Sequence, residues 1–300
     1  MNTVEVAEVV KAYDKKIAVD HLSFSIRQGS IFGLLGPNGA GKTSTIRMLI
    51  GITLPDSGTV RIFGEPFRRA LLQRIGYLPE QPGLYRKLKV LEQLVMLGEL
   101  HGLRAQDAKK RATEWCERLE IAGSLGSKYE ELSKGMQQKV QFIASLLHDP
   151  EFLIMDEPFS GLDPVNAKLL KDTLLDLRQQ GKTVLFSSHR MDQVEKLCDD
   201  ICLVNGGKAV LNGNLREIKA RYGKSSVQIE YDGDRDVLRD NSLVKSLDKY
   251  ENYVEVQMIE GADSQALLKM LVDRSRINKF EVVEPSLDEI FREVVGRVDA

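Results

Sequence analysis

Cysteine is scarce in this sequence, and the cysteines present do not form a pattern typical of disulfides or of a metal site. The 300 residues contain three cysteines, an odd number, with no C-x-x-C pair among them. Cys198 and Cys202 lie four residues apart, but the pattern between them changes from helix to strand, which argues against a shared metal ion. We therefore expect these two residues and Cys116 to be small buried side chains in a reducing compartment.

Long apolar runs and an excess of charge of one sign are absent as well. No run approaches the ~18 apolar residues that cross a bilayer, and no signal peptide is recognisable, so we expect a chain that reaches a membrane only through a partner. The 42 Lys and Arg residues nearly balance the 44 Asp and Glu residues. Without a basic field, we expect no nucleic-acid partner. A hydrophobic content of 42% is typical of a globular protein, and the length suggests about two domains.

The most informative stretch is residues 31–45. An apolar run predicts a buried strand, a glycine-rich turn follows it, and Lys42 and Thr43 open a helix, which together match the phosphate-loop pattern G-x-x-x-x-G-K-[ST]. Backbone N–H groups and the helix N-terminus can wrap a polyphosphate there. We expect Lys42 to reach the β- and γ-phosphates and the Thr43 hydroxyl to hold Mg²⁺. The residues expected to bind the phosphates are Gly36, Pro37, Asn38, Gly39, Ala40, Gly41, Lys42, Thr43 and Ser44.

Two further strands are expected to end in chemically active side chains. The apolar run 152–156 ends in Asp156 and Glu157, and consecutive carboxylates at the end of a buried strand are costly to desolvate without a partner. Mg²⁺ for Asp156 and an attacking water for Glu157 supply such partners. The apolar run 183–188 delivers His189 to the same edge of the predicted sheet, where ligands bind in α/β folds.

Two other positions each allow a structural and a functional interpretation. Tyr13, in a short polar connection between the strands expected at 4–10 and 22–26, is either a half-buried aromatic or a ring that stacks on a purine. Ser133 is a good N-cap for an amphipathic helix that runs to His148. The same helix start is alternatively an anion site presented to a phosphate on another molecule.

After a linker-like break at 222–226, a second and smaller unit begins. Strands are expected at 227–231, 253–259 and 279–283, and a helix at 265–272. Ser286 and Glu289 form a capping box for a final helix. This unit contains no catalytic constellation, so its expected role is packing or docking, in dimerisation, regulation or substrate-linked assembly.

With these motifs in this order, the sequence resembles the ATP-binding-cassette (ABC) ATPases. The matching stretches are 36–43 (phosphate loop), 132–136 (signature), 152–157 (metal and base), 160–163 (the loop that follows) and His189 (switch histidine). The resemblance implies an α/β fold of the P-loop NTPase type, with a mixed sheet core and a helical subdomain at about 86–145, and a small α+β C-terminal domain. The expected domains are 1–215, the nucleotide-binding domain, and 224–300, an accessory domain.

The resemblance also implies that two such domains face each other head to tail, with ATP between the phosphate loop of one and the signature of the other. Ser133 and Gly135 would contact the partner's ATP, and Asp163 belongs to the loop after the metal strand. Lys134 and Met136 depart from the usual Leu-Ser-Gly-Gly-Gln signature. The glutamine that usually follows the Tyr-Leu-Pro strand is Glu80 by register, with Gln81 one step later, and we assign the role to Glu80.

More narrowly, the sequence resembles the ABC-2 type export branch, which includes sodium- and drug-efflux subunits. The resemblance implies an ATP-hydrolysing subunit that uses ATP and Mg²⁺ and couples dimer closure to multi-spanning permease subunits at the cytoplasmic face of the cell membrane. Its partner ATPase is a second copy or a related chain. The alternatives are an ABC ATPase without a transport partner and a nucleotide-binding regulator or silent half of a heterodimer.

Overall fold

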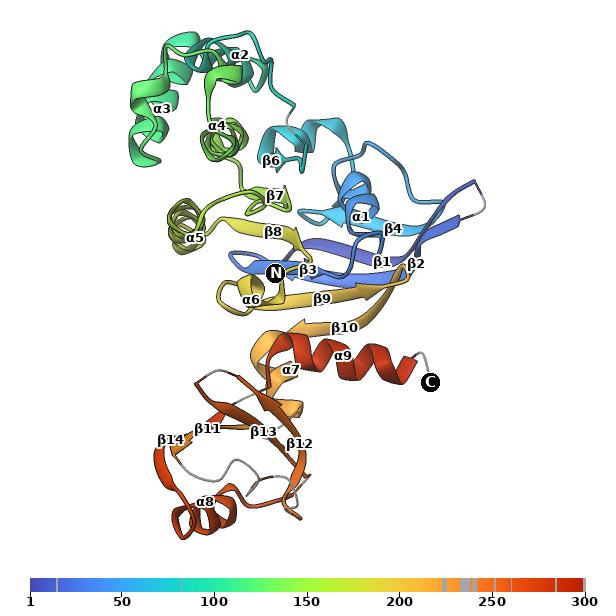
Figure 1. Cartoon of the computed structure of the whole chain (residues 1–300). Helices are drawn as coiled ribbons and strands as arrows, with labels where there is room; N and C mark the ends of the chain where they lie inside the picture. Colours follow the sequence, from blue (N-terminus) through green and yellow to red (C-terminus); the bar gives the residue numbers. More distant parts are fainter. Residues whose placement is uncertain are drawn as a thin grey trace. The chain divides into compact units, whose positions relative to one another are not determined.

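The computed structural model describes residues 1–14, 16–81, 83–222, 226–232, 238, 242–250, 252–259, 261–283 and 285–298. The contacts within the chain divide it into two compact units, Met1–Gly213 and Asn214–Ala300. Figure 1 labels the helices and strands of both units.

The first unit is built on a six-stranded sheet with the strand order β10-β9-β3-β8-β7-β6. Strands β6, β7, β8, β3 and β9 run parallel to one another. This arrangement places the C-terminal ends of β3, β7 and β8 side by side at one edge, as the sequence predicts. The bounds are β3 Ile31–Leu35, β6 Ile75–Leu78, β7 Phe152–Asp156, β8 Thr183–Ser188, β9 Asp200–Asn205 and β10 Lys208–Asn214.

A second, antiparallel sheet has the order β2-β1-β4-β5. Its strands are β1 Asn2–Tyr13, β2 Lys16–Arg27, β4 Ser57–Ile62 and β5 Glu65–Pro66. Strands β1 and β2 are longer than the apolar alternation predicts, because their polar ends form a hairpin that exposes side chains to solvent. Tyr13 is therefore the last residue of a strand, paired with Lys16, and not part of a loop.

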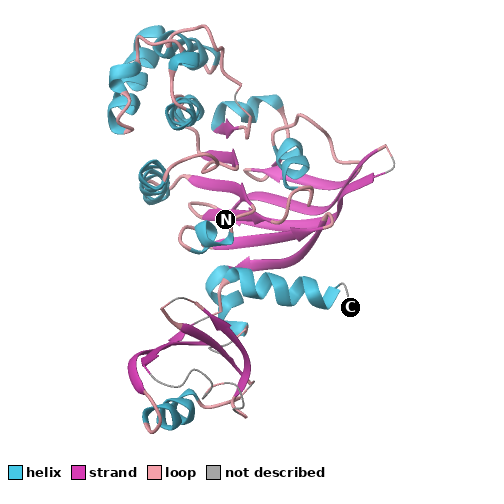
Figure 2. Ribbon diagram, viewed as in Figure 1, coloured by secondary structure: helices cyan, strands magenta, loops and turns pink. Residues whose placement is uncertain are grey.

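Helices pack on these sheets and on one another (Figure 2). Helix α1 contacts β2, β4 and β7, α4 contacts β6, and α5 contacts β8. Helices α2, α3 and α4 contact each other and form a helical group within residues 90–146, which overlaps the range of about 86–145 expected for a helical subdomain. The bounds are α1 Lys42–Leu49, α2 Val90–Leu100, α3 Ala105–Arg118, α4 Lys134–Leu146, α5 Pro164–Gln179 and α6 Met191–Glu195, with 3₁₀ turns at Arg69–Arg74, Ala122–Ser124 and Tyr129–Glu131. The short helix α6 precedes β9, in agreement with the change from helix to strand that the sequence predicts between Cys198 and Cys202.

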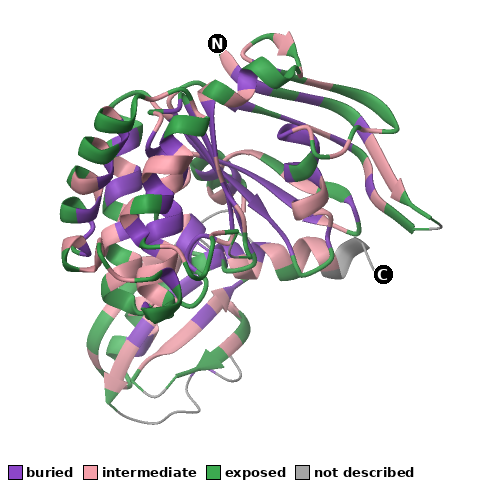
Figure 3. Ribbon diagram, turned by 90° about the horizontal axis from the view of Figure 1, so that it is seen from above, coloured by how far each residue is buried: buried purple, intermediate pink, exposed green. Residues whose placement is uncertain are grey.

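The hydrophobic core of this unit lies between the sheets and α1 (Figure 3). Phe24 of β2 stacks on Phe32 of β3 with ring centroids 5.2 Å apart, which joins the two sheets. Every residue of β3 and of β7 is buried. The strands that carry the phosphate loop and Asp156 are therefore held rigidly from both faces.

In its described residues, the second unit contains an antiparallel sheet with the order β12-β13-β11-β14 and helices α7, α8 and α9. Strand β12 was not predicted from the sequence. Ser286 and Glu289 form the expected capping box, with Ser286 N–H 2.6 Å from Glu289 Oε2 and Glu289 N–H 3.2 Å from Ser286 Oγ. The bounds are β11 Ser226–Asp232, β12 Val244–Lys249, β13 Val254–Met258, β14 Arg276–Val283, α7 Leu215–Arg221, α8 Ser264–Val272 and α9 Leu287–Val298. Part of the predicted linker, residues 223–225, lies outside the described residues.

No helix in the described parts of either unit combines the length and the apolar character that crossing a membrane requires.

Candidate nucleotide-binding site

The phosphate loop joins the end of β3 to the start of α1, and its glycines have two different roles. A Cβ at Gly36 would lie 2.1 Å from the carbonyl oxygen of Val204, and a Cβ at Gly41 would lie 2.3 Å from that of Ala18. These two glycines therefore let the backbones of β9 and β2 pack against the loop. Gly39 has a φ of +80° and no atom within 4 Å of its Cβ position, so it faces open space. Of the three, Gly39 leaves room for a ligand.

Lys42 is nearly buried, with 7% of its surface exposed. Its ammonium donates hydrogen bonds to the carbonyl oxygens of Gly36 at 2.7 Å and Pro37 at 3.1 Å. Burial lowers the pKa of Lys42, and the nearby carboxylates of Glu157 and Asp156 act in the opposite direction. The lysine is thus held inside the curve of the loop, where its charge faces the cavity.

Asp156 brings together the ends of β7, β8 and α1. It is 2% exposed, and its Oδ2 accepts a hydrogen bond of 3.0 Å from the Thr43 hydroxyl. Its Oδ1 accepts one from the Ser187 hydroxyl. In the sheet register, Asp156 lies directly beside Ser187 of β8. A carboxylate and a hydroxyl at this distance form an oxygen-rich pair of the type that Mg²⁺ prefers.

Glu157 follows Asp156 in a left-handed conformation, with φ at +50°. Its backbone N–H donates to Ser187 Oγ at 3.1 Å, and its Oε1 lies 2.8 Å from Nδ1 of His189. The Glu157 side chain is 11% exposed, whereas that of His189 is 48% exposed. A non-glycine residue in this conformation stores backbone strain, which is common at functional sites.

These side chains line one cavity of about 380 Å³. The cavity brings together most of the residues that the sequence predicts for binding and catalysis. Its lining residues are Lys16, Ala18, Asn38, Gly39, Gly41, Lys42, Thr43, Ser44, Glu80, Asp156, Glu157, Ser160 and His189. Glu80 belongs to this lining and Gln81 does not. Pro37 contributes its carbonyl to Lys42, and the carbonyl of buried Ala40 accepts a hydrogen bond of 3.0 Å from the Gly207 N–H.

The other predicted residues lie outside this lining. Tyr13 is 38% exposed at the end of β1, with the Lys11 ammonium 5.7 Å from its ring centroid. Ser133 caps α4 by accepting a hydrogen bond of 3.3 Å from Met136 N–H. Asp163 caps α5 in the same way, and its hydrogen bonds to Asn166 lower the pKa of its carboxyl.

The signature and the Asp163 loop are nevertheless neighbours. A Cβ at Gly135 would lie 3.5 Å from the Asn166 amide nitrogen, and that amide donates to Asp163. The structure therefore forms two clusters within one unit: the cavity around Lys42, and a separate surface made by the starts of α4 and α5.

Sequence reasoning missed Ser187 and Lys16. Ser187 is fully buried and bonds both Asp156 and the Glu157 backbone. A serine as the penultimate residue of an apolar strand, next to the strand of Asp156, is the pattern that could have revealed it. The position of Lys16 at the site depends on its pairing with Tyr13 across the hairpin, and the sequence does not display this pairing.

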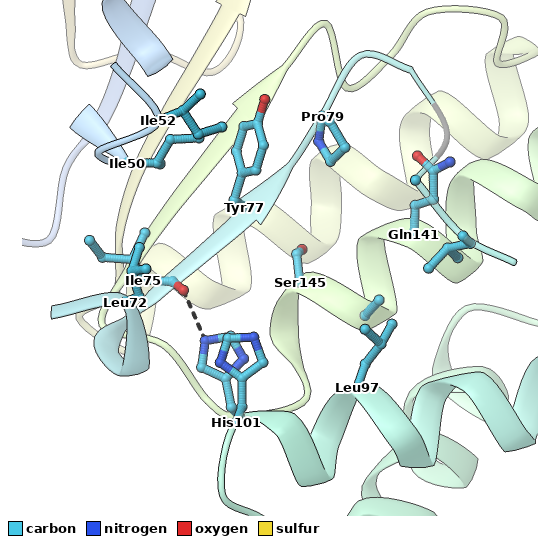
Figure 4. A pocket seen from close by; sticks show the side chains of 14 residues that line it. Ile50, Ile52, Leu72, Ile75, Tyr77, Pro79, Leu97, His101, Gln141 and Ser145 are labelled. Carbon is cyan, nitrogen blue, oxygen red and sulfur yellow. Dashed lines mark hydrogen bonds between the residues drawn. The ribbon is translucent and has the colours of Figure 1, made fainter. Parts of the chain in front are cut away.

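A second pocket of the first unit is mainly apolar and has a volume of about 400 Å³ (Figure 4). Its walls are formed by the segment that follows α1, by strand β6 and the loop that follows it in the sequence, and by helices α2 and α4. The lining residues are Ile50, Ile52, Leu72, Ile75, Tyr77, Pro79, Gly83, Leu84, Leu97, His101, Gln141, Ala144, Ser145 and His148. The rings of His101 and His148 stack there at 3.8 Å, and His148 Nε2 lies 3.0 Å from the carbonyl oxygen of Ile75.

Comparison with known proteins agrees with this geometry. Residues 19–160 match the family model described as ABC transporter, and residues 213–295 match the model described as ATP-binding protein DrrA1-3-like, C-terminal domain. A solved structure of an ATP-binding subunit of an ABC transporter superposes with a TM-score of 0.68 at 30% identity, over 74% of this chain and 93% of that one.

Relatives in bacteria match along nearly the whole chain. The ABC transporter ATP-binding protein YhaQ of Bacillus subtilis is 45% identical over 290 residues, 97% of each chain. The Nod factor export ATP-binding protein I of Ralstonia nicotianae is 34% identical, over 96% of this chain and 92% of that one. The linearmycin resistance ATP-binding protein LnrL of Bacillus subtilis is 33% identical, over 96% of this chain and 97% of that one.

The fold and the cavity define an ATP-hydrolysing domain of the P-loop class. The chain belongs to the family of ABC transporter ATP-binding proteins. It is the ATP-binding subunit of an ABC transporter, and its export-type relatives match the ABC-2 branch that the sequence indicates. The predicted fold class, function and ATPase activity are thereby confirmed.

Proposed function

We propose that the cavity around Lys42 is the ATP site and that its residues have the roles the sequence suggests. The observation that carries this proposal is the convergence of Lys42, Thr43, Asp156, Glu157 and His189 on one cavity. Residues 36–44 bind the phosphates through backbone N–H groups and Lys42. Tyr13, which pairs across the hairpin with the cavity residue Lys16, stacks on the base.

Thr43 and Asp156 are the residues that would hold Mg²⁺. Their oxygens already lie 3.0 Å apart, and Asp156 has no salt bridge within the described part of the chain. A nearly buried carboxylate without a cationic partner carries a desolvation cost that a divalent ion removes. Mg²⁺, when bound, supplies positive charge that stabilises the phosphates during transfer to water.

Glu157 acts as the general base for the attacking water. Its carboxylate is largely shielded from solvent, and its direct contact with His189 fixes its direction. With Nδ1 of His189 bonded to Glu157, Nε2 of the exposed ring is the nitrogen left for a phosphate, and it donates to a phosphate oxygen when the ring is an imidazolium. Glu80 also lines the cavity and serves as the residue that responds to the nucleotide and to the membrane partner.

Two ATP-binding subunits complete each site, with a second copy of this chain or a related chain as the partner. Ser133 and Gly135 lie outside the cavity of their own chain. They belong to the N-terminus of α4, where the helix dipole is positive and the first turn contains no acidic residue. We propose that this helix start, with Asp163 beside it, contacts the ATP held by the partner.

The transport partner is a multi-spanning permease, which holds the subunit at the cytoplasmic face of the cell membrane. The apolar pocket of Figure 4 is the docking place, because Pro79, Gly83 and Leu84 in its wall belong to the same loop as Glu80. A permease segment in this pocket would press on the loop that carries Glu80 into the nucleotide cavity. We also propose that residues 1–215 are the nucleotide-binding domain, with a helical subdomain at 86–145. Residues 224–300 are then an accessory domain.

The test is affinity purification of the tagged chain from detergent-solubilised membranes of its own source, with mass spectrometry of the proteins recovered. We expect a multi-spanning membrane protein to be recovered with the wild type. Ile52→Glu should lose it, because Ile52 is 62% exposed and lines the apolar pocket. Leu54→Glu is the matched control, since Leu54 is 70% exposed in the same loop but outside the lining.

Recovery of ribosomes or of soluble proteins alone would contradict the transport role and favour an ABC ATPase without a permease. Equal loss of the membrane protein with both variants would contradict the pocket as the docking place. Both variants should still bind ATP, which is measured on the same preparations.

A further inference from the structure

One cation of the nucleotide cavity has no role in the assignments above. Lys16 is the first residue of β2, and it lines the cavity together with Lys42, Thr43 and Ser44. In the hairpin register it lies directly across from Tyr13, the last residue of β1. The hairpin thus brings an aromatic ring and an ammonium group to the same end of the site.

The backbone that carries Lys16 is anchored to the phosphate loop. The carbonyl of Ala18 packs against Gly41 so closely that no Cβ fits between them. Farther along β2, Asp20 N–H donates to the Gly207 carbonyl at 2.9 Å, and Gly207 N–H donates to the Ala40 carbonyl at 3.0 Å. Lys16 and Ala18 of this strand both line the cavity, beside the loop residues Gly39 and Gly41.

Lys16 also differs from neighbouring lysines in the partners of its ammonium group. Lys11 of β1 forms a salt bridge of 2.7 Å with Asp56, and Lys208 forms one of 3.3 Å with Asp20. The two hydrogen bonds of Lys42 to the loop carbonyls take up part of its donor capacity. Lys16 forms no salt bridge with any residue that the structure describes. Its three N–H donors therefore remain for an anion that enters the cavity.

We propose that Lys16 is a positioning residue for ATP, contacting the phosphates from the β2 wall while Lys42 contacts them from within the loop. This inference rests on the proposed function of the cavity and adds a residue that couples the base end of the site to the phosphate end. Because the contact forms with the bound nucleotide before hydrolysis, Lys16 contributes mainly to binding and less to the chemical step.

The test is displacement of a fluorescent ATP analogue by ATP, ADP and adenosine, for the wild type and for Lys16→Ala. A charge-assisted hydrogen bond to phosphate corresponds to about a tenfold change in affinity at a partly exposed site. We expect Lys16→Ala to weaken ATP and ADP by about tenfold and adenosine by much less, and to raise KM more than it lowers kcat. Lys16→Arg should restore most of the affinity, and the salt dependence of ATP binding should be shallower in Lys16→Ala.

Lys109→Ala is the matched control, because it removes one exposed lysine of α3 and changes the net charge equally. Lys42→Ala is included to test the cavity itself. Unchanged ATP affinity in Lys16→Ala, or an equal loss for adenosine and ATP, would overturn the role of Lys16 while leaving the ATP site intact. A wild type that binds no ATP, or a Lys42→Ala variant that binds it normally, would instead contradict the proposed function.

Discussion

The imidazole of His189 and the carboxylate of Glu157 are in direct contact, with Nδ1 and Oε1 2.8 Å apart. The contact joins the ends of β8 and β7, two neighbouring parallel strands. A carboxylate at Nδ1 favours the proton on that nitrogen, so Nε2 accepts hydrogen bonds in the neutral ring and donates them only in the imidazolium. Glu157 and His189 are thus oriented by each other.

Replacing the base tests its role most directly. In Glu157→Gln the side chain keeps its size and can still contact His189, but it can no longer accept a proton from water. We expect steady-state ATP turnover to fall by at least about 100-fold, the usual contribution of a general base, with ATP still bound. Phosphate release and nucleotide binding measure the two effects separately.

Glu151→Gln serves as the control for this substitution. Glu151 immediately precedes β7 and pairs with Arg74 on the surface, away from the cavity. We expect its turnover to match the wild type. If Glu157→Gln also turned over ATP at the wild-type rate, another group would have to be the base.

Ser187 should support the metal site, although it contacts neither nucleotide nor metal in the proposed arrangement. Its hydroxyl donates to Asp156 and accepts from the Glu157 N–H, so Ser187→Ala removes a support from both acidic residues. We expect the Mg²⁺ concentration for half-maximal turnover to rise by about 10-fold or more, because groups that orient metal ligands have effects of this size. A Mg²⁺ titration of turnover measures the change.

Ser145→Ala is the matched control for a buried serine. Its hydroxyl donates to the Phe142 carbonyl within α4, so its loss should affect stability without changing the Mg²⁺ requirement. An unchanged Mg²⁺ titration for Ser187→Ala would show that Asp156 needs no such support.

The glycine-rich loop at 36–41 and the strands that lead to Asp156 and His189 could be predicted because their patterns are local. Residues 31–45 contain the strand, the glycines and the helix start within one window, and Phe152–Asp156 and Thr183–Ser188 are continuous apolar runs. Strand β12, with the sequence VKSLDK, lies at the edge of its sheet and has too few apolar residues for such recognition.

Contacts that depend on how strands pair could not be predicted in the same way. Ser187 meets Asp156 because β7 and β8 are neighbours in a particular register, and Lys16 meets the cavity because β1 and β2 extend beyond their apolar segments. The packing of Gly36 against β9 and of Gly41 against β2 likewise depends on neighbours that the sequence does not display. Such relationships belong to tertiary structure.

Sharing of the ATP site between two chains predicts complementation. Lys42→Ala removes the phosphate lysine, and Ser133→Asp keeps a side chain that caps α4 but places a negative charge where the partner's γ-phosphate would lie. We expect each variant alone to lose most of its turnover. A mixture should recover turnover, because one site of each mixed dimer combines an intact Lys42 with an intact Ser133.

The matched control is a mixture of Lys42→Ala with Glu157→Gln. Each substitution affects the cavity of the chain that carries it. One site of each mixed dimer would therefore lack the base, and the other would lack the lysine. No recovery is expected. Equal turnover in the two mixtures would contradict the assignment of Ser133 to the partner's site.

The stacked histidines of the apolar pocket predict how stability depends on acid. Burial, with a smaller contribution from His101, lowers the pKa of His148 to about 4, although its bond to the Ile75 carbonyl and nearby Asp149 oppose this effect and Arg111 adds to it. In the unfolded chain the pKa is near the ordinary value of about 6.5. Between these two values the unfolded state binds the additional proton, so the folded state loses stability as the pH falls from about 6.5 to 4.

Thermal unfolding of the wild type and of His148→Phe at several pH values between 7.5 and 4.5 measures this effect. The phenyl ring keeps the stacking but carries no titrating group, so we expect its unfolding midpoint to fall less on acidification, despite a cost of about 1 kcal/mol at neutral pH for the lost bond to Ile75. Ser145→Ala is the control, because Ser145 lines the same pocket and carries no titrating group, so its removal should leave the pH dependence close to that of the wild type. Parallel pH profiles for the wild type and His148→Phe would mean that His148 binds its proton equally in the folded and unfolded states, which its burial in the apolar pocket argues against.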